Sequence, residues 1–306
     1  MTEGRSGILV VDKAAGVTSF DVVAAVRRAL RLRRVGHAGT LDPAATGVLP
    51  ILLGEATKLM PYLVDQDKEY LATIRLGITT DTGDLTGRVT STAAAPPLEW
   101  RQVERVLAGF IGRVRQTPPM YSAVHHEGRR LYELAREGVE VERASREVVV
   151  HAITLEALDP GSMTLRIICG KGTYVRSFVG DLGVALGCGA TVARLVRTRV
   201  GPFLLAEAVA SPEIGTLDRE GLGRQVRPPE AALATWPGVT LDDAGADAFL
   251  HGQVAGAPGP LGAGTLVRVH DGGGRMIGVG QIAPSRAVQP VRILHADRPG
   301  SRRLPA

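Results

Sequence analysis

The sequence predicts a fold that mixes strands and helices, with a large domain over residues 1–235 and a small β-rich domain over residues 236–306. The chain has 306 residues, 44% of them apolar, so it is long enough to form one large core and a second, smaller one. Short runs of β-forming residues occur between stretches of helical periodicity. Around residues 228–237 the composition shifts, and the remainder is rich in glycine.

Local signals define the first strand and the first helix. Residues 7–11 form a short apolar run of β-formers, which is typical of a buried strand. Thr18 and Asp21 have the spacing of a capping box, which predicts that a helix begins there. The buried face of this helix is expected to carry Val22, Val23, Val26 and Leu30.

The rest of the large domain is predicted from composition and periodicity. Glycine and turn formers dominate residues 35–50, and residues 78–87 are expected to form a loop. Residues 116–147 are polar and basic, which indicates an insertion over the surface. Strands are expected at residues 70–76, 148–155 and 164–169, a strand or turn at residues 191–200, and helices at residues 55–64, 98–110 and 175–186.

Three β-like runs are predicted in the small domain. A DGGG sequence at residues 271–274 is expected to form a hairpin turn between the first two of them. The runs cover residues 265–269, 276–282 and 291–294.

Composition also excludes several classes of protein. No apolar run approaches the roughly 20 residues that span a bilayer, and the N-terminus lacks the pattern of a signal peptide. Cys169 and Cys188 are too few for a disulfide framework or a metal cluster and are expected to be small core residues. The neighbouring His125 and His126 lack partners at metal spacing and are expected on the surface. The sequence therefore predicts a soluble, cytoplasmic protein without metal or cofactor.

Positive charge is concentrated in the first two-thirds of the chain. Residues 1–206 hold 26 basic and 21 acidic side chains, whereas residues 207–306 hold 10 of each. Such an excess favours a polyanionic partner, although a preference for arginine is also typical of GC-rich genomes. A run of five arginines lies near the expected C-terminus of the first helix, where cations are favourable in any case. These are Arg27, Arg28, Arg31, Arg33 and Arg34.

Residues 36–50 are the segment that points most directly to chemistry. Their sequence is GHAGTLDPAATGVLP. The glycines allow close approach of the backbone, and Pro43 restricts Asp42 to extended geometry and so aims its carboxylate. His37 can form hydrogen bonds, stack or insert as a wedge. An Asp-Pro pair alone is ordinarily only a turn, so the inference depends on the whole string.

This string, preceded by DKAAG at residues 12–16, closely resembles the bacterial tRNA pseudouridine-55 synthases of the TruB family. The resemblance covers about residues 7–200 and is weaker over residues 236–306, where the family carries a small PUA-type RNA-binding domain. It implies an α+β fold, with a mixed, largely antiparallel sheet and flanking helices, plus a PUA-like domain. The strand and helix pattern agrees with this fold but does not select it. The further motifs that occur in the family's order are DKEY at residues 67–70, TDTGD at 80–84, QTPPMYSA at 116–123 and KGTYVR at 171–176.

The resemblance implies an enzyme that isomerises uridine-55 in the T-loop of tRNA to pseudouridine, by base flipping and without a cofactor. The uracil leaves N1, turns, and is rejoined to the ribose through C5. Asp42 matches the family's catalytic aspartate. The role suits a carboxylate, because departure of the base leaves C1′ electron-poor and an ionised carboxylate can stabilise it, as in glycoside hydrolysis. Arg176 matches the arginine that pairs with this aspartate and keeps it ionised. Taken alone, Arg176 is more typical of a surface or phosphate contact.

The resemblance implies that the remaining site residues contact the substrate. Tyr70 matches the tyrosine that stacks on the target base, a contact worth about 1–3 kcal/mol, and is a candidate to move the C5 proton. Tyr174 and Leu195 would line the pocket, and His37 would replace the extruded nucleotide. Lys13 and the arginine run would meet phosphates. Without the resemblance, Tyr70 and Leu195 would be interpreted as ordinary core residues.

Two alternatives remain open at this point. The first is a guide-RNA-dependent synthase that acts with partner proteins. The insertion over residues 116–147 argues against it, because it is suited to gripping an RNA arm unaided. The second is a tRNA-binding folding factor whose catalysis is secondary.

The family often has Leu-Arg-Arg where this chain has Leu195-Val196-Arg197, which puts one peripheral phosphate contact in doubt. We expect tRNA as the partner, with no guide RNA, membrane or obligatory protein partner.

Overall fold

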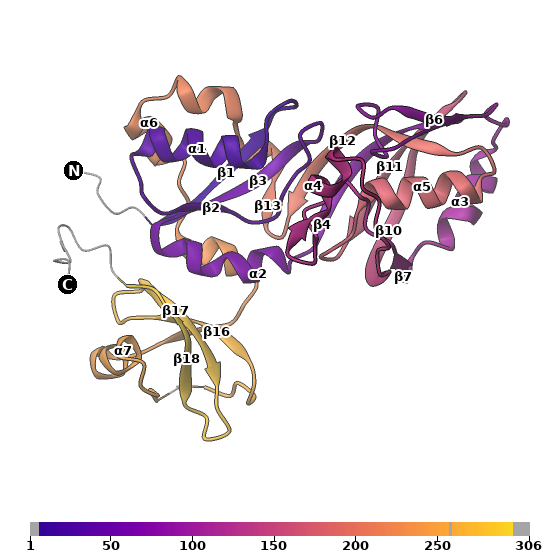
Figure 1. Cartoon of the computed structure of the whole chain (residues 1–306). Helices are drawn as coiled ribbons and strands as arrows, with labels where there is room; N and C mark the ends of the chain where they lie inside the picture. Colours follow the sequence, from indigo (N-terminus) through magenta and orange to yellow (C-terminus); the bar gives the residue numbers. More distant parts are fainter. Residues whose placement is uncertain (1–5, 257–258, 296–306) are drawn as a thin grey trace. The chain divides into compact units, whose positions relative to one another are not determined.

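The computed structural model describes residues 6–256 and 259–295 (Figure 1). The chain divides into two compact units. Both units combine helices with strands in parallel and antiparallel pairs, which confirms the α+β class. None of the helices in these two described ranges is long and apolar enough to cross a membrane. Unit 1 consists of Met1–Leu41, Leu49–Val64 and Gly201–Ala306, and unit 2 of Asp42–Val48 and Asp65–Val200.

Helix α1 (Ser19–Leu30) in unit 1 begins at the predicted capping box. The Thr18 hydroxyl accepts a hydrogen bond from the Asp21 N–H at 3.1 Å, and the Asp21 carboxylate accepts one from the Thr18 N–H at 2.8 Å. The helix ends at Arg31, which adopts a left-handed conformation with φ of 52°. The predicted apolar face is confirmed, since the buried residues of the helix include Val22, Val23, Val26 and Leu30.

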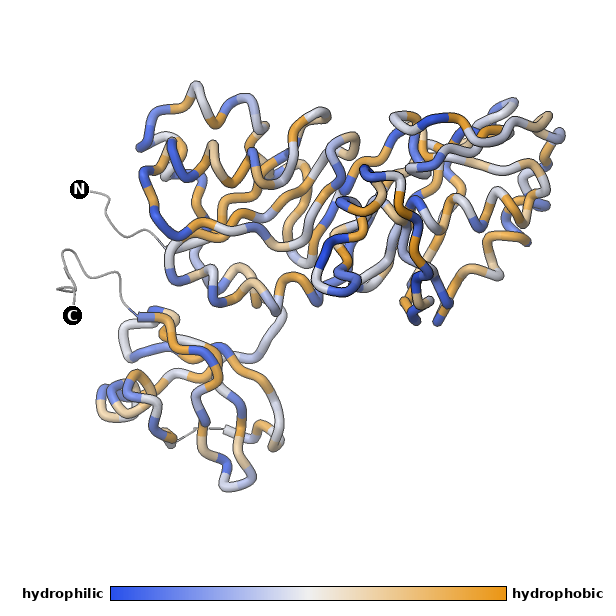
Figure 2. Tube along the Cα trace, in the orientation of Figure 1, coloured by the Kyte–Doolittle hydropathy of each residue, from blue (hydrophilic) through white to orange (hydrophobic). Residues whose placement is uncertain are grey.

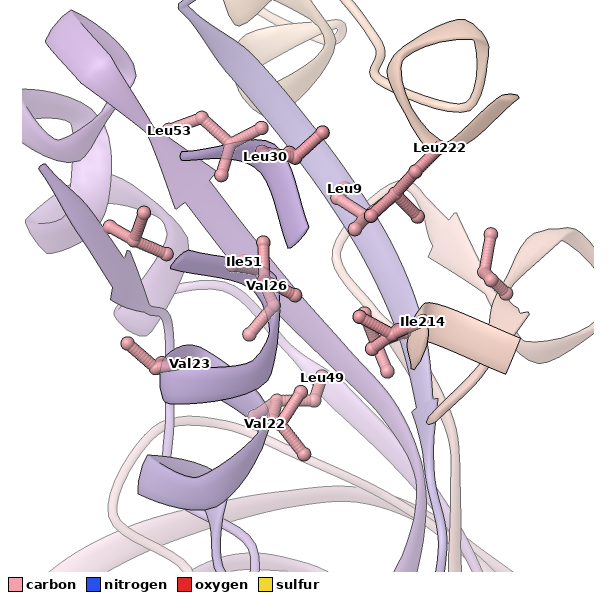
Figure 3. Packing of buried hydrophobic residues seen from close by; sticks show 13 residues of the cluster. Leu9, Val22, Val23, Val26, Leu30, Leu49, Ile51, Leu53, Ile214 and Leu222 are labelled. Carbon is pink, nitrogen blue, oxygen red and sulfur yellow. The ribbon is translucent and has the colours of Figure 1, made fainter. Parts of the chain in front are cut away.

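This face of α1 packs on the strands of unit 1, in the order β14, β1, β3 (Figure 3). Strand β1 runs parallel to β14, and β2 is antiparallel to β3. Apolar side chains of β1 and β3, such as Leu9 and Ile51, meet α1, and Ile214 and Leu222 close the same cluster. The elements are β1 (Gly7–Lys13), β2 (Val35–His37), β3 (Thr46–Leu53), η1 (Gly54–Leu59), α2 (Met60–Val64), β13 (Phe203–Leu204), η2 (Leu205–Glu207), β14 (Val209–Ala210), η3 (Ser211–Gly215), α6 (Arg219–Arg224) and η4 (Pro229–Leu233).

The C-terminal part of unit 1 is a four-stranded sheet with its own hydrophobic core. Both hydrophobic and hydrophilic residues occur along its strands (Figure 2), and burial alternates along the strand at residues 266–270. The predicted hairpin turn joins β16 and β17, which are antiparallel. The helix α7 is absent from the sequence predictions. The elements are β15 (Gly238–Thr240), α7 (Asp243–Leu250), β16 (Leu266–His270), β17 (Met276–Ile282) and β18 (Val288–Ile293).

The sheet of unit 2 has the strand order β12, β4, β11, β10, β7. These strands are antiparallel, and the first residues of β3, Thr46 and Gly47, pair in parallel with β12. Helices α3 and α5 contact each other, and the ring of Phe110, just after α3, lies 5.3 Å from that of Phe178 in α5, centroid to centroid. The elements are β4 (Lys68–Leu76), α3 (Trp100–Ala108), β7 (Gly112–Gln116), β10 (Arg146–Asp159), β11 (Ser162–Cys169), α5 (Val175–Ala185) and β12 (Ala190–Val200).

Four predictions of local structure need correction. Residues 35–50 contain β2 and the buried start of β3, because apolar residues after Thr46 override the glycine signal. The helix expected at residues 55–64 begins as the 3₁₀ turn η1, and the loop at residues 78–87 begins with a strand of a hairpin. The insertion is not wholly superficial, since Gln116 and Ser122 are buried. The hairpins and helix concerned are β5 (Ile78–Thr80) with β6 (Val89–Thr92), β8 (His125–His126) with β9 (Arg129–Arg130), and α4 (Leu131–Arg136).

Candidate active site

Asp42 lies in a turn that leads into β3. Its backbone carbonyl accepts a hydrogen bond from the Ala45 N–H at 3.1 Å, which closes the turn. Pro43 limits the backbone of Asp42 to extended conformations. The side chain of Asp42 is 38% exposed, so its carboxylate is accessible to a ligand.

The structure brings Arg176 to Asp42, across 134 residues of sequence. Arg176 Nε lies 2.8 Å from Asp42 Oδ2, and the arginine side chain is only 5% exposed. Its two Nη atoms donate hydrogen bonds to the carbonyl oxygens of Thr82 and Tyr121, each at 2.7 Å. Since all three nitrogens are engaged, the guanidinium has one orientation and fixes one oxygen of the carboxylate. Arg176 is therefore not the surface arginine that its sequence position alone suggests.

Tyr70 lies in β4 directly opposite Arg197 of β12, so both side chains are on the same face of the sheet. Burial raises the pKa of Tyr70 above its usual value of 10, and the nearby negative charge of Asp42 adds to the rise. The positive charge of Arg197 and its hydrogen bond to the hydroxyl act in the opposite direction. Tyr70 is thus a neutral phenol at neutral pH, within electrostatic range of the Asp42 carboxylate.

Arg197 is the main site residue that the sequence did not reveal. It is 1% exposed, and its Nε donates a hydrogen bond to the carbonyl of Val48 at 2.8 Å. It therefore connects Tyr70 to the end of the segment that begins with Asp42. Val196, which stands where the family often has an arginine, is also buried, which agrees with the doubt about a phosphate contact at that position.

Lys68 and Cys169 extend this buried polar face of the sheet. Lys68 precedes Tyr70 by two residues on β4 and lies opposite Cys169 of β11. Burial, reinforced by the positive charge of Arg197, lowers the pKa of Lys68 to about 8. Burial raises the pKa of Cys169 to about 11, although a hydrogen bond with Thr173 opposes this. The prediction that both cysteines are buried and unpaired is confirmed.

The two residues expected to line the pocket lie in the same unit. Leu195 is 9% exposed and lies opposite Ala72 of β4, on the same face as Tyr70. Tyr174 immediately precedes α5 and is partly exposed. The guanidinium of Arg146 lies over the Tyr174 ring, 5.9 Å from its centroid. Tyr174 therefore presents an aromatic face beside a cation, which suits a nucleobase.

The other two predicted substrate residues belong to unit 1. His37 is the last residue of β2 and is partly buried. Lys13 is fully buried at the end of β1, where its ammonium group donates hydrogen bonds to the carbonyls of Ala14 at 2.9 Å and Val17 at 2.8 Å. These contacts hold the loop after β1. The roles of both residues toward RNA stay predictions.

The other chemistry-bearing residues of the sequence lie elsewhere. His125 is exposed and His126 partly exposed in β8, which confirms the prediction of a surface pair. Within residues 6–256 and 259–295, no group of three or more His, Cys, Asp or Glu side chains is arranged to hold a metal ion.

The chain matches known proteins over nearly its whole length. Residues 27–175 match the N-terminal domain of the TruB family pseudouridylate synthases, residues 176–234 the tRNA pseudouridylate synthase B C-terminal domain, and residues 237–294 the C-terminal domain of pseudouridine synthase II TruB. The tRNA pseudouridine synthase B of Aromatoleum aromaticum is 43% identical over 94% of this chain and 92% of its own. That of Pseudomonas aeruginosa is 42% identical over 95% and 96%.

Solved structures share the fold. A chain in the crystal structure of a Cbf5-Nop10-Gar1 complex is 25% identical, with a TM-score of 0.74 over 95% of this chain and 85% of that one. A chain of the archaeal box H/ACA sRNP Nop10-Cbf5 complex is 24% identical, with a TM-score of 0.71. Together with the identity to its relatives, the three matched domains establish that the chain belongs to the TruB family of pseudouridylate synthases.

Proposed function

We propose that this tRNA pseudouridine synthase acts on uridine-55 of the T-loop, with Asp42 as the catalytic aspartate and the target base flipped out of the loop. The observation that carries the proposal is the pairing of Asp42 with Arg176 beside Tyr70. A carboxylate accessible from solvent, held by a buried cation and flanked by an aromatic ring, suits a nucleoside whose glycosidic bond must break.

The chemistry follows from what each group offers. The N1–C1′ bond breaks and its electron pair leaves with the uracil, so C1′ becomes electron-poor and is stabilised by the Asp42 carboxylate. Tyr70 and Tyr174 hold the detached base by stacking while it turns. The C1′–C5 bond then forms and C5 loses its proton, while N1 gains one. No atom is added or lost overall, so the reaction needs no co-substrate.

Access to the base requires RNA binding and extrusion of the nucleotide. A base inside the folded T-loop cannot reach Asp42, and its unstacking costs a few kcal/mol. We assign the compensating contacts to His37, which replaces the base, and to the arginines at the end of α1 and just after it, which meet phosphates. Lys13 is fully buried, so it acts by holding the loop after β1. We also assign residues 236–306 to a PUA-like RNA-binding domain that begins after residue 235. The identity of the relatives supports tRNA as the substrate.

Guide-RNA dependence is the competing proposal, since the similar solved structures include H/ACA complexes. The greater identity to proteins named tRNA pseudouridine synthase B favours action without a guide RNA or protein partner. A tRNA-folding role is compatible with the same binding surface. The cytoplasmic location stays a prediction.

The experiment uses purified protein and one unmodified tRNA transcript, without guide RNA. We expect pseudouridine to form at position 55, located by mass spectrometry of nuclease fragments. Asp42→Asn keeps the size of the side chain and one acceptor oxygen but removes its charge, so it should abolish the product while tRNA binding persists. Product at another position, or an active Asp42→Asn variant, would contradict the proposal. Activity that appears only after a guide RNA is added would favour the competing one.

A further inference from the structure

Gln116, the last residue of β7, is a buried polar side chain whose partners are in another element. It is 4% exposed. Its Nε2 donates a hydrogen bond to the Tyr174 carbonyl at 3.0 Å, and its Oε1 accepts one from the Tyr174 N–H at 2.7 Å. Both ends of the amide are therefore used on a single backbone residue. Only glutamine has this donor and acceptor pair at this chain length, because glutamate at neutral pH has no donor and asparagine is one methylene shorter.

Tyr174 is the residue from which α5 starts. No side chain caps the start of this helix at Tyr174. The Tyr174 carbonyl also accepts the first helical hydrogen bond, from the Phe178 N–H at 3.1 Å. The Gln116 amide thus fixes the peptide from which the helix is built, and Arg176 follows two residues later in the first turn.

Two more hydrogen bonds join the same two segments. The Ser177 hydroxyl donates to the Thr117 carbonyl at 2.8 Å, and Arg176 donates to the Tyr121 carbonyl at 2.7 Å. Residues 116–121 are the root of the insertion that the sequence predicts to grip RNA. This root therefore contacts Tyr174, Arg176 and Ser177, just before α5 and in its first turn.

We propose that Gln116 is a positioning residue for pseudouridine formation, since its amide fixes the start of α5 and so holds Arg176 against Asp42. The inference rests on the proposed function of the Asp42–Arg176 pair. Its physical basis is that a displacement of about 1 Å in a catalytic group can slow a reaction about 100-fold. The root of the insertion thereby supports the catalytic ion pair, in addition to any contact that the insertion makes with RNA.

The test compares Gln116→Ala and Gln116→Glu with the unchanged enzyme, in single-turnover reactions with enzyme in excess over unmodified tRNA. We expect Gln116→Ala to lower the rate constant about 30- to 100-fold, with the reaction still going to completion. Gln116→Glu keeps the acceptor for the Tyr174 N–H but sets a charged carboxylate oxygen against the Tyr174 carbonyl, so it should slow the reaction by about 10-fold or more. The Kd for tRNA should change by less than about 3-fold in both variants.

Gln102→Ala is the matched control, because Gln102 is exposed on α3 in the same unit. Its rate constant should equal that of the unchanged enzyme. A purely structural role of Gln116 would reduce the fraction of enzyme that binds tRNA and leave the rate constant of the remainder unchanged, which would overturn the inference. A normal rate constant in both Gln116 variants would do the same. These results are distinct from failure of the proposed function, which an active Asp42→Asn variant would reveal.

Discussion

Replacing Arg176 by lysine keeps a positive charge near Asp42 but removes the geometry that fixes the carboxylate. The guanidinium donates to Asp42 at 2.8 Å and to two backbone carbonyls at 2.7 Å each, in three directions. A lysine ammonium is a compact group on a flexible chain and cannot occupy the three donor positions of the planar fork. The substitution therefore leaves at least one of the carbonyls of Thr82 and Tyr121 without its partner.

The size of the effect follows from these contacts. A hydrogen bond from a charged donor contributes about 1.5–3 kcal/mol. Lysine keeps a charge beside Asp42, whose ion pair is screened by water at 38% exposure, so we count the loss of about one hydrogen bond to a carbonyl, in the lower half of that range. A loss of about 2 kcal/mol from the transition state corresponds to a rate about 30-fold lower, at about 1.4 kcal/mol for each factor of ten. Arg176→Met removes the charge as well and should be slower still.

The assay is a single-turnover reaction on unmodified tRNA, with the Kd measured separately. We expect the rate constant of Arg176→Lys to fall about 30-fold while the Kd changes by less than about 3-fold. Arg113→Lys is the control, because Arg113 is 76% exposed and forms a surface ion pair with Glu147. A normal rate for Arg176→Lys would refute the need for a fixed orientation. Equal rates for the lysine and methionine variants would refute a contribution from the charge.

Four further outcomes test other parts of the structure. Gly47→Ala should unfold unit 2 or destabilise it by more than about 3 kcal/mol in urea denaturation, because φ is +104° and the new Cβ would lie 2.2 Å from the Arg197 carbonyl oxygen. The pKa of Lys68 is lowered to about 8 in the folded protein, so the Lys68 amine binds its proton more tightly in the unfolded chain. The contribution of Lys68 to the free energy of unfolding should therefore rise between pH 8 and pH 10.5. Urea titrations of Lys68→Met over the same pH range should lack this rise. The Kd for tRNA should rise steeply with salt in a filter-binding series, since phosphate contacts release counterions. Truncation after residue 235 should raise the Kd and leave turnover at saturating tRNA largely intact; complete loss of turnover would contradict the assignment of that domain.

Local sequence signals were sufficient where the structure depends on neighbouring residues. The capping box at Thr18 and the buried face of α1 follow from spacings of three and four residues, so they could be predicted. The start of β3 could not, because the glycines of residues 36–47 indicate a turn and the pairing of Gly47 with Arg197 is long-range. Similarly, no local pattern predicts that the helix after β3 begins as a 3₁₀ turn.

In the site, residues within motifs could be predicted, whereas a residue placed only by long-range pairing could not. Asp42 and Tyr70 could be named because each lies within a motif that resembles the TruB family, and Arg176 could be named for the same reason although spacing gives no sign of its partner. Arg197 corresponds to an arginine of the family's Leu-Arg-Arg, but it was not named as a site residue. Its burial arises from three neighbours far away in sequence, Tyr70 across the sheet, Gly47 alongside, and the Val48 carbonyl. A basic residue two positions after a leucine in a strand, and so on the same face of the sheet, is the one local signal that could have identified it.

The two buried arginines of the site explain why the segment from Asp42 to Val48 can hold an accessible carboxylate in one place. Arg176 binds the first residue of this segment through its side chain, and Arg197 binds the last through its backbone carbonyl. Each arginine is anchored independently, Arg176 by α5 and Arg197 by β12. A loop that is tied at both ends to rigid elements loses little further entropy when substrate binds. Loss of either arginine should therefore slow the reaction more than it weakens tRNA binding. If both arginines hold the same segment, the double variant should react only a little more slowly than the slower of the two single variants.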